Sequence, residues 1–135
     1  VNQARTNDGA TPLMVAAQKG YAEVVSLLIA CGAAVNQATT NNGATPLYIA
    51  AEKGLTEVVG LLINSGATVN QATTGVGITP LFIATQEGHT EVISLLISSG
   101  AAVNQGRTGN GITPLHIAAR KGHTEVASLL ISSGA

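Results

Sequence analysis

The sequence repeats itself every 34 residues, and this period constrains the fold more than any other feature. Val1, Val35, Val69 and Val103 begin equivalent units, and each unit runs from Val-Asn-Gln to Thr-Pro-Leu and beyond. Periods of roughly 20 to 50 residues are typical of solenoids and other repeat arrays. The period therefore predicts one domain, residues 1–135, made of four copies: 1–34, 35–68, 69–102 and 103–135.

Each copy carries the signals of a short first helix. In the first copy Thr11 precedes Pro12, and Gly20 follows eight residues later. A threonine side chain accepts the amide hydrogens left unpaired at a helix start, and proline at the first helical position loses no hydrogen bond. Glycine favours the left-handed conformation in which many helices end. We predict a helix from about Pro12 to Lys19.

A second helix is predicted from about Ala22 to Ala30, with Glu23 well placed against the helix dipole and Gly32 as the stop signal. Helices shorter than about 12 residues are marginal alone in water, so neighbouring copies must stabilise them by stacking. Ala16 and Ala17 give the first helix a packing face of small side chains. We therefore expect first helices to pack more closely than second helices, in an array that is concave on the side of the first helices.

Polar stretches with a glycine connect the helix pairs. Two of them contain Asn-Gly, at Asn42-Gly43 and Asn110-Gly111, which is a strong signal for a tight hairpin turn. The predicted fold class is an all-α repeat solenoid in which each unit is a β-hairpin finger plus two short antiparallel helices.

These motifs resemble a known family. The string TPLHIA, from Thr113 to Ala118, is followed by ARKGHTEV and ends in LLISSGA, and it resembles the ankyrin repeat. The resemblance covers all four units. It implies a scaffold that binds a protein or peptide partner on its fingers and first helices. Two departures concern the fingers, which are one residue longer than usual and have threonine where the family has aspartate, at Thr6, Thr40, Thr74 and Thr108.

Composition argues against several other classes of function. The formal charge is −1 and only 10% of residues are charged, so no basic surface for nucleic acid is expected. The apolar runs span only a few residues, which predicts no membrane insertion. No leader segment is visible. Cys31 is the only cysteine and forms no internal disulfide, so we expect a reducing, cytoplasmic location.

No constellation of residues predicts catalysis, a cofactor or a metal. His89 and His123 are equivalent repeat residues and have no ligand cluster beside them in the sequence, so a packing role is the better interpretation. Cys31 stands where other copies have serine, and the glutamates occur once per repeat. No phosphate-binding glycine motif is present. We predict that the chain is not an enzyme.

Differences between the copies indicate the binding surface. The most varied position of the first helix holds four different residues, and the position one turn later varies as well. The finger tips and the residue after the turn glycine are the other varied places. The candidate partner-binding residues are Arg5, Asp8, Met14, Gln18, Asn42, Tyr48, Glu52, Val76, Ile78, Phe82, Gln86, Arg107, Ile112, His116 and Arg120.

Tyr48 and Phe82 are predicted to be neighbouring aromatic contacts, because aromatic residues are enriched among interface hot spots. A competing interpretation is that their position is partly buried and tolerates different shapes. A second alternative concerns the whole chain, which is then a spacer segment of a longer array or an engineered repeat scaffold with no natural partner. Leu129 and Ile131 remain apolar in the last helix, which predicts end-to-end self-association through uncapped terminal repeats.

Overall fold

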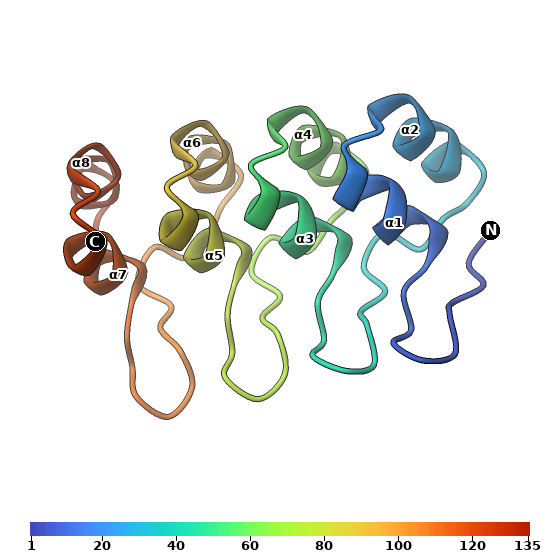
Figure 1. Ribbon diagram of the computed structural model, residues 1–135. Coiled ribbons are helices and arrows are strands. Elements are labelled where there is room, and N and C mark those ends of the chain that lie inside the picture. Colours follow the sequence, from blue (N-terminus) through green and yellow to red (C-terminus); the bar gives the residue numbers. More distant parts are fainter.

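Eight short helices in two rows make up the computed structural model, which describes residues 1–135. The first row comprises α1 (Pro12–Lys19), α3 (Pro46–Lys53), α5 (Pro80–Glu87) and α7 (Pro114–Lys121). The second row comprises α2 (Ala22–Ala30), α4 (Thr56–Asn64), α6 (Thr90–Ser98) and α8 (Thr124–Ser132). In Figure 1 the first row lies next to the long loops, and the second row lies on the side away from them.

The predicted boundaries of α1 and α2 are confirmed, and the caps explain them. The hydroxyl oxygen of each cap threonine accepts a hydrogen bond from the backbone amide three residues later. The distances are 3.3 Å for Thr11, 3.1 Å for Thr45 and 3.1 Å for Thr79. Proline occupies the first turn of each of these helices. Gly20 has a φ of 74° and is the left-handed residue that ends α1. A left-handed glycine ends the first helix of every unit, whereas the Thr113 hydroxyl at the start of the fourth unit's first helix lies 2.8 Å from His116 Nδ1.

Small residues lie between neighbouring first-row helices. Ala17, Ala50, Ala51 and Ala84 are fully buried, whereas the second row packs through larger side chains such as Leu62. First-row helices make more extensive contacts with one another than second-row helices do. The predicted difference in packing is therefore confirmed.

The residue before each of α4, α6 and α8 reaches back over the preceding repeat. His89 packs against Gly54 and His123 packs against Gly88, as Leu55 packs against Gly20. The His89 Nε2 atom also lies 2.9 Å from the carbonyl oxygen of Glu52. These contacts give the two histidines a packing role.

The loops between helix pairs, called fingers here (residues 1–10, 35–44, 69–78 and 103–112), contain turns and no β-strand. The predicted β-hairpins are therefore not confirmed. In the first finger the Arg5 amide donates to the Ala10 carbonyl oxygen over 2.9 Å, but Arg5 O accepts from Gly9 over 3.0 Å. The Ala10 amide donates instead to Asp8 Oδ1 over 3.0 Å. The Asp8 side chain thus accepts the amide hydrogen that a β-hairpin would use in a bond between its two strands.

An asparagine in each Val-Asn-Gln motif fastens the finger to the end of the second-row helix in the same repeat. Asn36 Nδ2 donates to Gly66 O over 3.1 Å, and Asn36 Oδ1 accepts from the Thr68 amide over 2.7 Å. Asn2 and Asn70 make equivalent pairs of bonds. The motif therefore holds each finger at a fixed angle to its helices.

Candidate partner-binding groove

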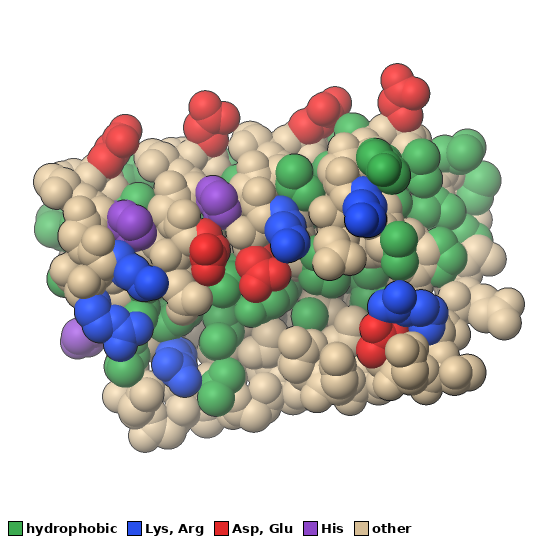
Figure 2. Space-filling view, viewed as in Figure 1, with side chains coloured by type: hydrophobic (Ala, Val, Ile, Leu, Met, Phe, Trp, Pro, Cys, Tyr) green, Lys and Arg blue, Asp and Glu red, His purple; other side chains and the backbone are tan.

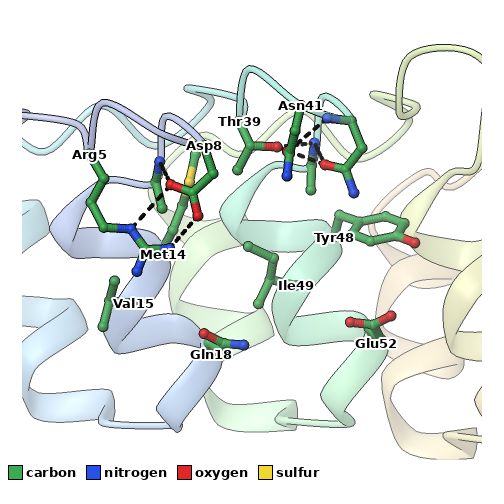
Figure 3. A pocket seen from close by; sticks show the side chains of 13 residues that line it. Arg5, Asp8, Met14, Val15, Gln18, Thr39, Asn41, Tyr48, Ile49 and Glu52 are labelled. Carbon is green, nitrogen blue, oxygen red and sulfur yellow. Dashed lines mark hydrogen bonds and ion pairs between the residues drawn. The ribbon is translucent and has the colours of Figure 1, made fainter.

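The fingers and the first-row helices face each other along one side of the array, and we call the surface between them the finger groove. Figure 2 shows apolar side chains here, between the polar fingers and the charged ends of the helices. A pocket of about 220 Å³, the groove pocket, opens between the first two repeats. Small-molecule sites are usually larger, about 300 to 1,000 Å³. Seven predicted binding residues line the groove pocket (Figure 3): Arg5, Asp8, Met14, Gln18, Asn42, Tyr48 and Glu52.

Arg5 and Asp8 form an ion pair at the tip of the first finger. Arg5 Nε donates to Asp8 Oδ1 over 3.1 Å, and the Ala10 amide donates to the same oxygen. The hydrogen bond from Ala10, followed by the one from Arg5, lowers the pKa of Asp8 from its ordinary value of 3.8. Exposed ion pairs add little stability, so the main effect of this pair is to fix the shape of the finger.

The second finger presents two asparagines to the groove pocket. Asn42 Oδ1 accepts from the Thr39 hydroxyl over 2.7 Å and from the Ala44 amide over 3.1 Å. Asn41 Oδ1 accepts from the Asn42 amide over 2.8 Å. The oxygens are thus occupied, while the exposed Nδ2 groups donate to no group of the chain. Both side chains hold free donors at the edge of the pocket.

Tyr48 extends from α3 toward the third repeat, as Figure 3 shows. Its side chain is half-buried and its hydroxyl makes no hydrogen bond within the chain. Burial, followed by the charges of Glu52 and Glu87, raises the pKa of Tyr48 above its ordinary value of 10.0. The phenol is therefore neutral at physiological pH, and the negative charges of Glu52 and Glu87 act on it.

Met14 and Phe82 are almost completely buried, although Met14 contributes to the wall of the groove pocket. Each is only 1% exposed, which favours the competing interpretation of a buried position over direct contact with a partner for both side chains. The position is the same one that leaves Tyr48 half-buried and His116 exposed. At this repeat position a wholly apolar side chain turns into the core, whereas a side chain with a polar end keeps that end in water.

The other predicted residues lie along the third and fourth repeats, outside the groove pocket. His116, Arg120 and Val76 are exposed, and the remaining four are partly buried: Ile78, Gln86, Arg107 and Ile112. Lys121 is exposed beside Arg120. Several basic side chains therefore gather at the end of the array that carries α7 and α8, at the left of Figure 2.

Six lining residues lie outside the predicted set of binding residues: Ala10, Val15, Thr39, Asn41, Ala44 and Ile49. Val15 is 39% exposed and Ile49 is partly exposed, while Ile117 at the same position is buried. This position is apolar in every copy, so differences between copies carry no signal for it. Only the positions of neighbouring helices decide which of these side chains reaches the surface.

The groups brought together are suited to binding and carry no arrangement for metal chemistry. No group of three or more His, Cys, Asp or Glu side chains is placed to hold a metal ion. The glutamates at the start of the second-row helices project singly from one edge of the array, visible at the top of Figure 2. Cys31 is exposed and unpaired at the end of α2.

Stacked helix pairs joined by fingers define a repeat solenoid, and comparison with protein families specifies which kind. The family model described as ankyrin repeats (3 copies) matches residues 1–73 and 69–135. The chain belongs to the ankyrin repeat family. Ankyrin repeats are generally protein–protein interaction modules and are typically not enzymes. A search of curated proteins finds no significant match. None of the eight helices combines the length and apolar character that a membrane span requires.

Proposed function

We propose that this chain is a scaffold that binds a protein or peptide partner along the finger groove. The observation that supports this most is the composition of the groove pocket, which combines exposed Val15 and half-buried Tyr48 with the free donors of Asn41 and Asn42. Interfaces typically have an apolar and aromatic centre surrounded by hydrogen-bonding groups. A binding surface prepared on a folded array also lowers the entropy cost of association.

The charges along the groove give the partner an orientation. The negative charges of Glu52 and Glu87 act on the Tyr48 ring. A basic side chain of the partner is therefore favoured there, at the centre of the groove. Arg120 and Lys121 favour acidic groups at the C-terminal end. Complementary charges mainly select the partner and its direction, and contribute less to raw affinity.

The proposed role is recognition without catalysis, cofactor or nucleic acid, and the formal charge of −1 fits a protein partner better than a polyanion. A cytoplasmic location is proposed as well, because the exposed thiol of Cys31 stays reduced in that compartment.

Selection from displayed peptide and domain libraries on the immobilised chain tests the proposal. Tyr48→Ala should weaken a selected partner at least about tenfold, as expected for a hot spot, where truncation costs more than about 1.4 kcal/mol. Ser94→Ala is the matched control, because Ser94 is exposed on the second row, in α6. It should leave the affinity unchanged.

Equal affinities of the two variants and the parent chain would contradict the assignment of the groove. A selection that yields no partner would favour the alternative of a spacer segment or an engineered scaffold, for which the close similarity of the four copies is the supporting feature.

A further inference from the structure

The repeat positions that line the groove pocket occur again two repeats further along the chain, and we call the later set the second groove segment. Its charged and exposed or half-buried apolar members are Val76, Ile78, Arg107, Ile112 and Arg120. The groove pocket holds one arginine, Arg5, and two carboxylates, Asp8 and Glu52. The second groove segment holds two arginines and no carboxylate. The sign of the charge therefore reverses along the finger groove.

Apolar side chains also become larger in the second groove segment. Val76 stands where the first finger has Asp8, and it is 44% exposed. Ile78 and Ile112 occupy a position that holds alanine in the first two repeats, and both are only partly buried. Figure 2 shows basic and apolar side chains next to one another at this end of the groove. The segment thus combines apolar walls with positive charge.

Arg107 lies where the fingers of the third and fourth repeats meet. The amide of the next residue, Thr108, donates to the Val76 carbonyl oxygen over 2.9 Å. The Arg107 side chain is partly buried, and its Nε atom is buried without a hydrogen-bond partner. A buried N–H of a charged group costs free energy when it is left unpaired. An acceptor supplied from outside the chain is therefore favoured at this place.

The first finger shows which acceptor suits an arginine of this kind. Arg5 stands at the same repeat position as Arg107 and donates to the carboxylate of Asp8, three residues later. The fourth finger has Asn110 in place of that aspartate, and Asn110 Oδ1 accepts from the Ile112 amide over 3.2 Å. The pair in the first finger is the one ion pair of the chain, so Arg107 has no carboxylate partner.

We propose that the second groove segment binds an acidic side chain of the partner, held by Arg107, with an aliphatic side chain of the partner beside it. This inference rests on the proposed function, because it assigns the partner's chemistry at one part of the same groove. The partner's carboxylate takes the role that Asp8 has in the first finger, and a planar guanidinium is well matched to it. The aliphatic side chain packs against the three apolar walls. Arg120 is exposed, so its charge mainly attracts and orients the acidic group.

Selection from a random-peptide display library on the immobilised chain tests the inference. The selected peptides should contain aspartate or glutamate next to an aliphatic residue. A synthetic copy of a selected peptide should lose affinity at least about tenfold when its acidic residue is replaced by the corresponding amide. The same selection on Arg107→Gln should no longer enrich acidic residues.

Three variants of the chain locate the contact of the synthetic peptide. Arg107→Gln should weaken binding at least about tenfold. Asn110→Asp should weaken it as well, because the new carboxylate occupies Arg107 as happens in the first finger. Ser94→Asp is the matched control, since it adds the same charge on the exposed side of α6 and should leave the affinity unchanged. All three variants should keep the parent circular-dichroism spectrum, which is recorded alongside.

The outcomes separate this inference from groove binding itself. Peptides whose binding depends on Tyr48 but which carry no acidic residue would overturn the inference and leave groove binding intact. Equal affinities of Arg107→Gln and the parent chain, or a loss with Ser94→Asp as large as that with Asn110→Asp, would overturn it too. A selection that yields no peptide would contradict both proposals.

Discussion

Gly43 holds a place where two fingers touch, and its replacement by alanine tests how closely they are packed. Gly43 has a φ of 72°, and a Cβ atom there would lie 2.9 Å from both the Thr74 amide nitrogen and its Cγ2 atom. Gly75 is the matched control, because it lies in the next finger with a φ of 78° and has no atom within 4 Å of its added Cβ. The two substitutions thus share the backbone strain and differ in the clash.

The expected loss of stability differs between the two variants. Alanine in the left-handed region costs about 1 to 2 kcal/mol, partly offset by a less flexible unfolded chain, which gives a net loss of about 1 kcal/mol for Gly75→Ala. Gly43→Ala adds overpacking of about 1 to 3 kcal/mol, because backbone must move. It also weakens the bond from the Thr74 amide to Asn42 O, 2.9 Å long, which contributes about 0.5 to 1.5 kcal/mol. We expect a total of about 3 to 5 kcal/mol.

Urea unfolding followed by circular dichroism measures both losses, and the midpoint should fall further for Gly43→Ala than for Gly75→Ala at equal slope. In thermal unfolding, each 1 kcal/mol corresponds to about 3 to 5 °C for a chain of this size. Equal losses in the two variants would refute the argument that finger contact, and not φ alone, requires glycine at position 43.

Three further predictions concern single side chains. Thr85→Val should raise the unfolding free energy by about 1 kcal/mol in a urea melt, because the fully buried Thr85 Oγ1 has no hydrogen-bond partner and valine keeps its shape; a lower midpoint would contradict this. Phe82→Ala should cost about 3 to 5 kcal/mol by the same assay, and a loss below about 1 kcal/mol would show that its ring is not in the core. The raised pKa of Tyr48 means that the folded state holds the phenol proton more tightly than the unfolded state. The stability that the neutral phenol contributes is therefore complete below pH 10.0 and is lost as the pH rises through the folded-state pKa. The parent chain should thus lose more stability above pH 10.0 than Tyr48→Phe does. Identical pH profiles of the unfolding free energy for the two chains would contradict the raised pKa of Tyr48.

Local signals in the sequence were sufficient to predict the helices. Thr11, Pro12 and Gly20 act within one turn of the chain, so the boundaries of α1 follow from their own chemistry. The finger was less predictable, because the Asp8 carboxylate competes with the backbone for the Ala10 amide and replaces the hairpin ladder. The order of the helices could thus be predicted, while the hydrogen bonds of the loops could not.

The candidate site could be predicted only in part, because exposure depends on contacts between repeats. Tyr48 and Phe82 occupy the same repeat position, yet one ring is half-buried in the groove and the other is in the core. Val15 was missed because its position is apolar in every copy. A position that does not vary cannot indicate which copy exposes its side chain to solvent. A pattern within one repeat therefore identifies the groove but not which side chains line it.

The footprint of a selected partner on the chain is the most direct test of groove binding. Amide chemical shifts of the isotope-labelled chain, recorded with and without the partner, assign the contact surface residue by residue. Groove binding predicts that the largest changes occur at Arg5 to Asp8, at Thr39 to Asn42 and around Tyr48, with little change in the second-row helices around Ser94. Changes concentrated on the second-row helices, with the fingers unaffected, would contradict it.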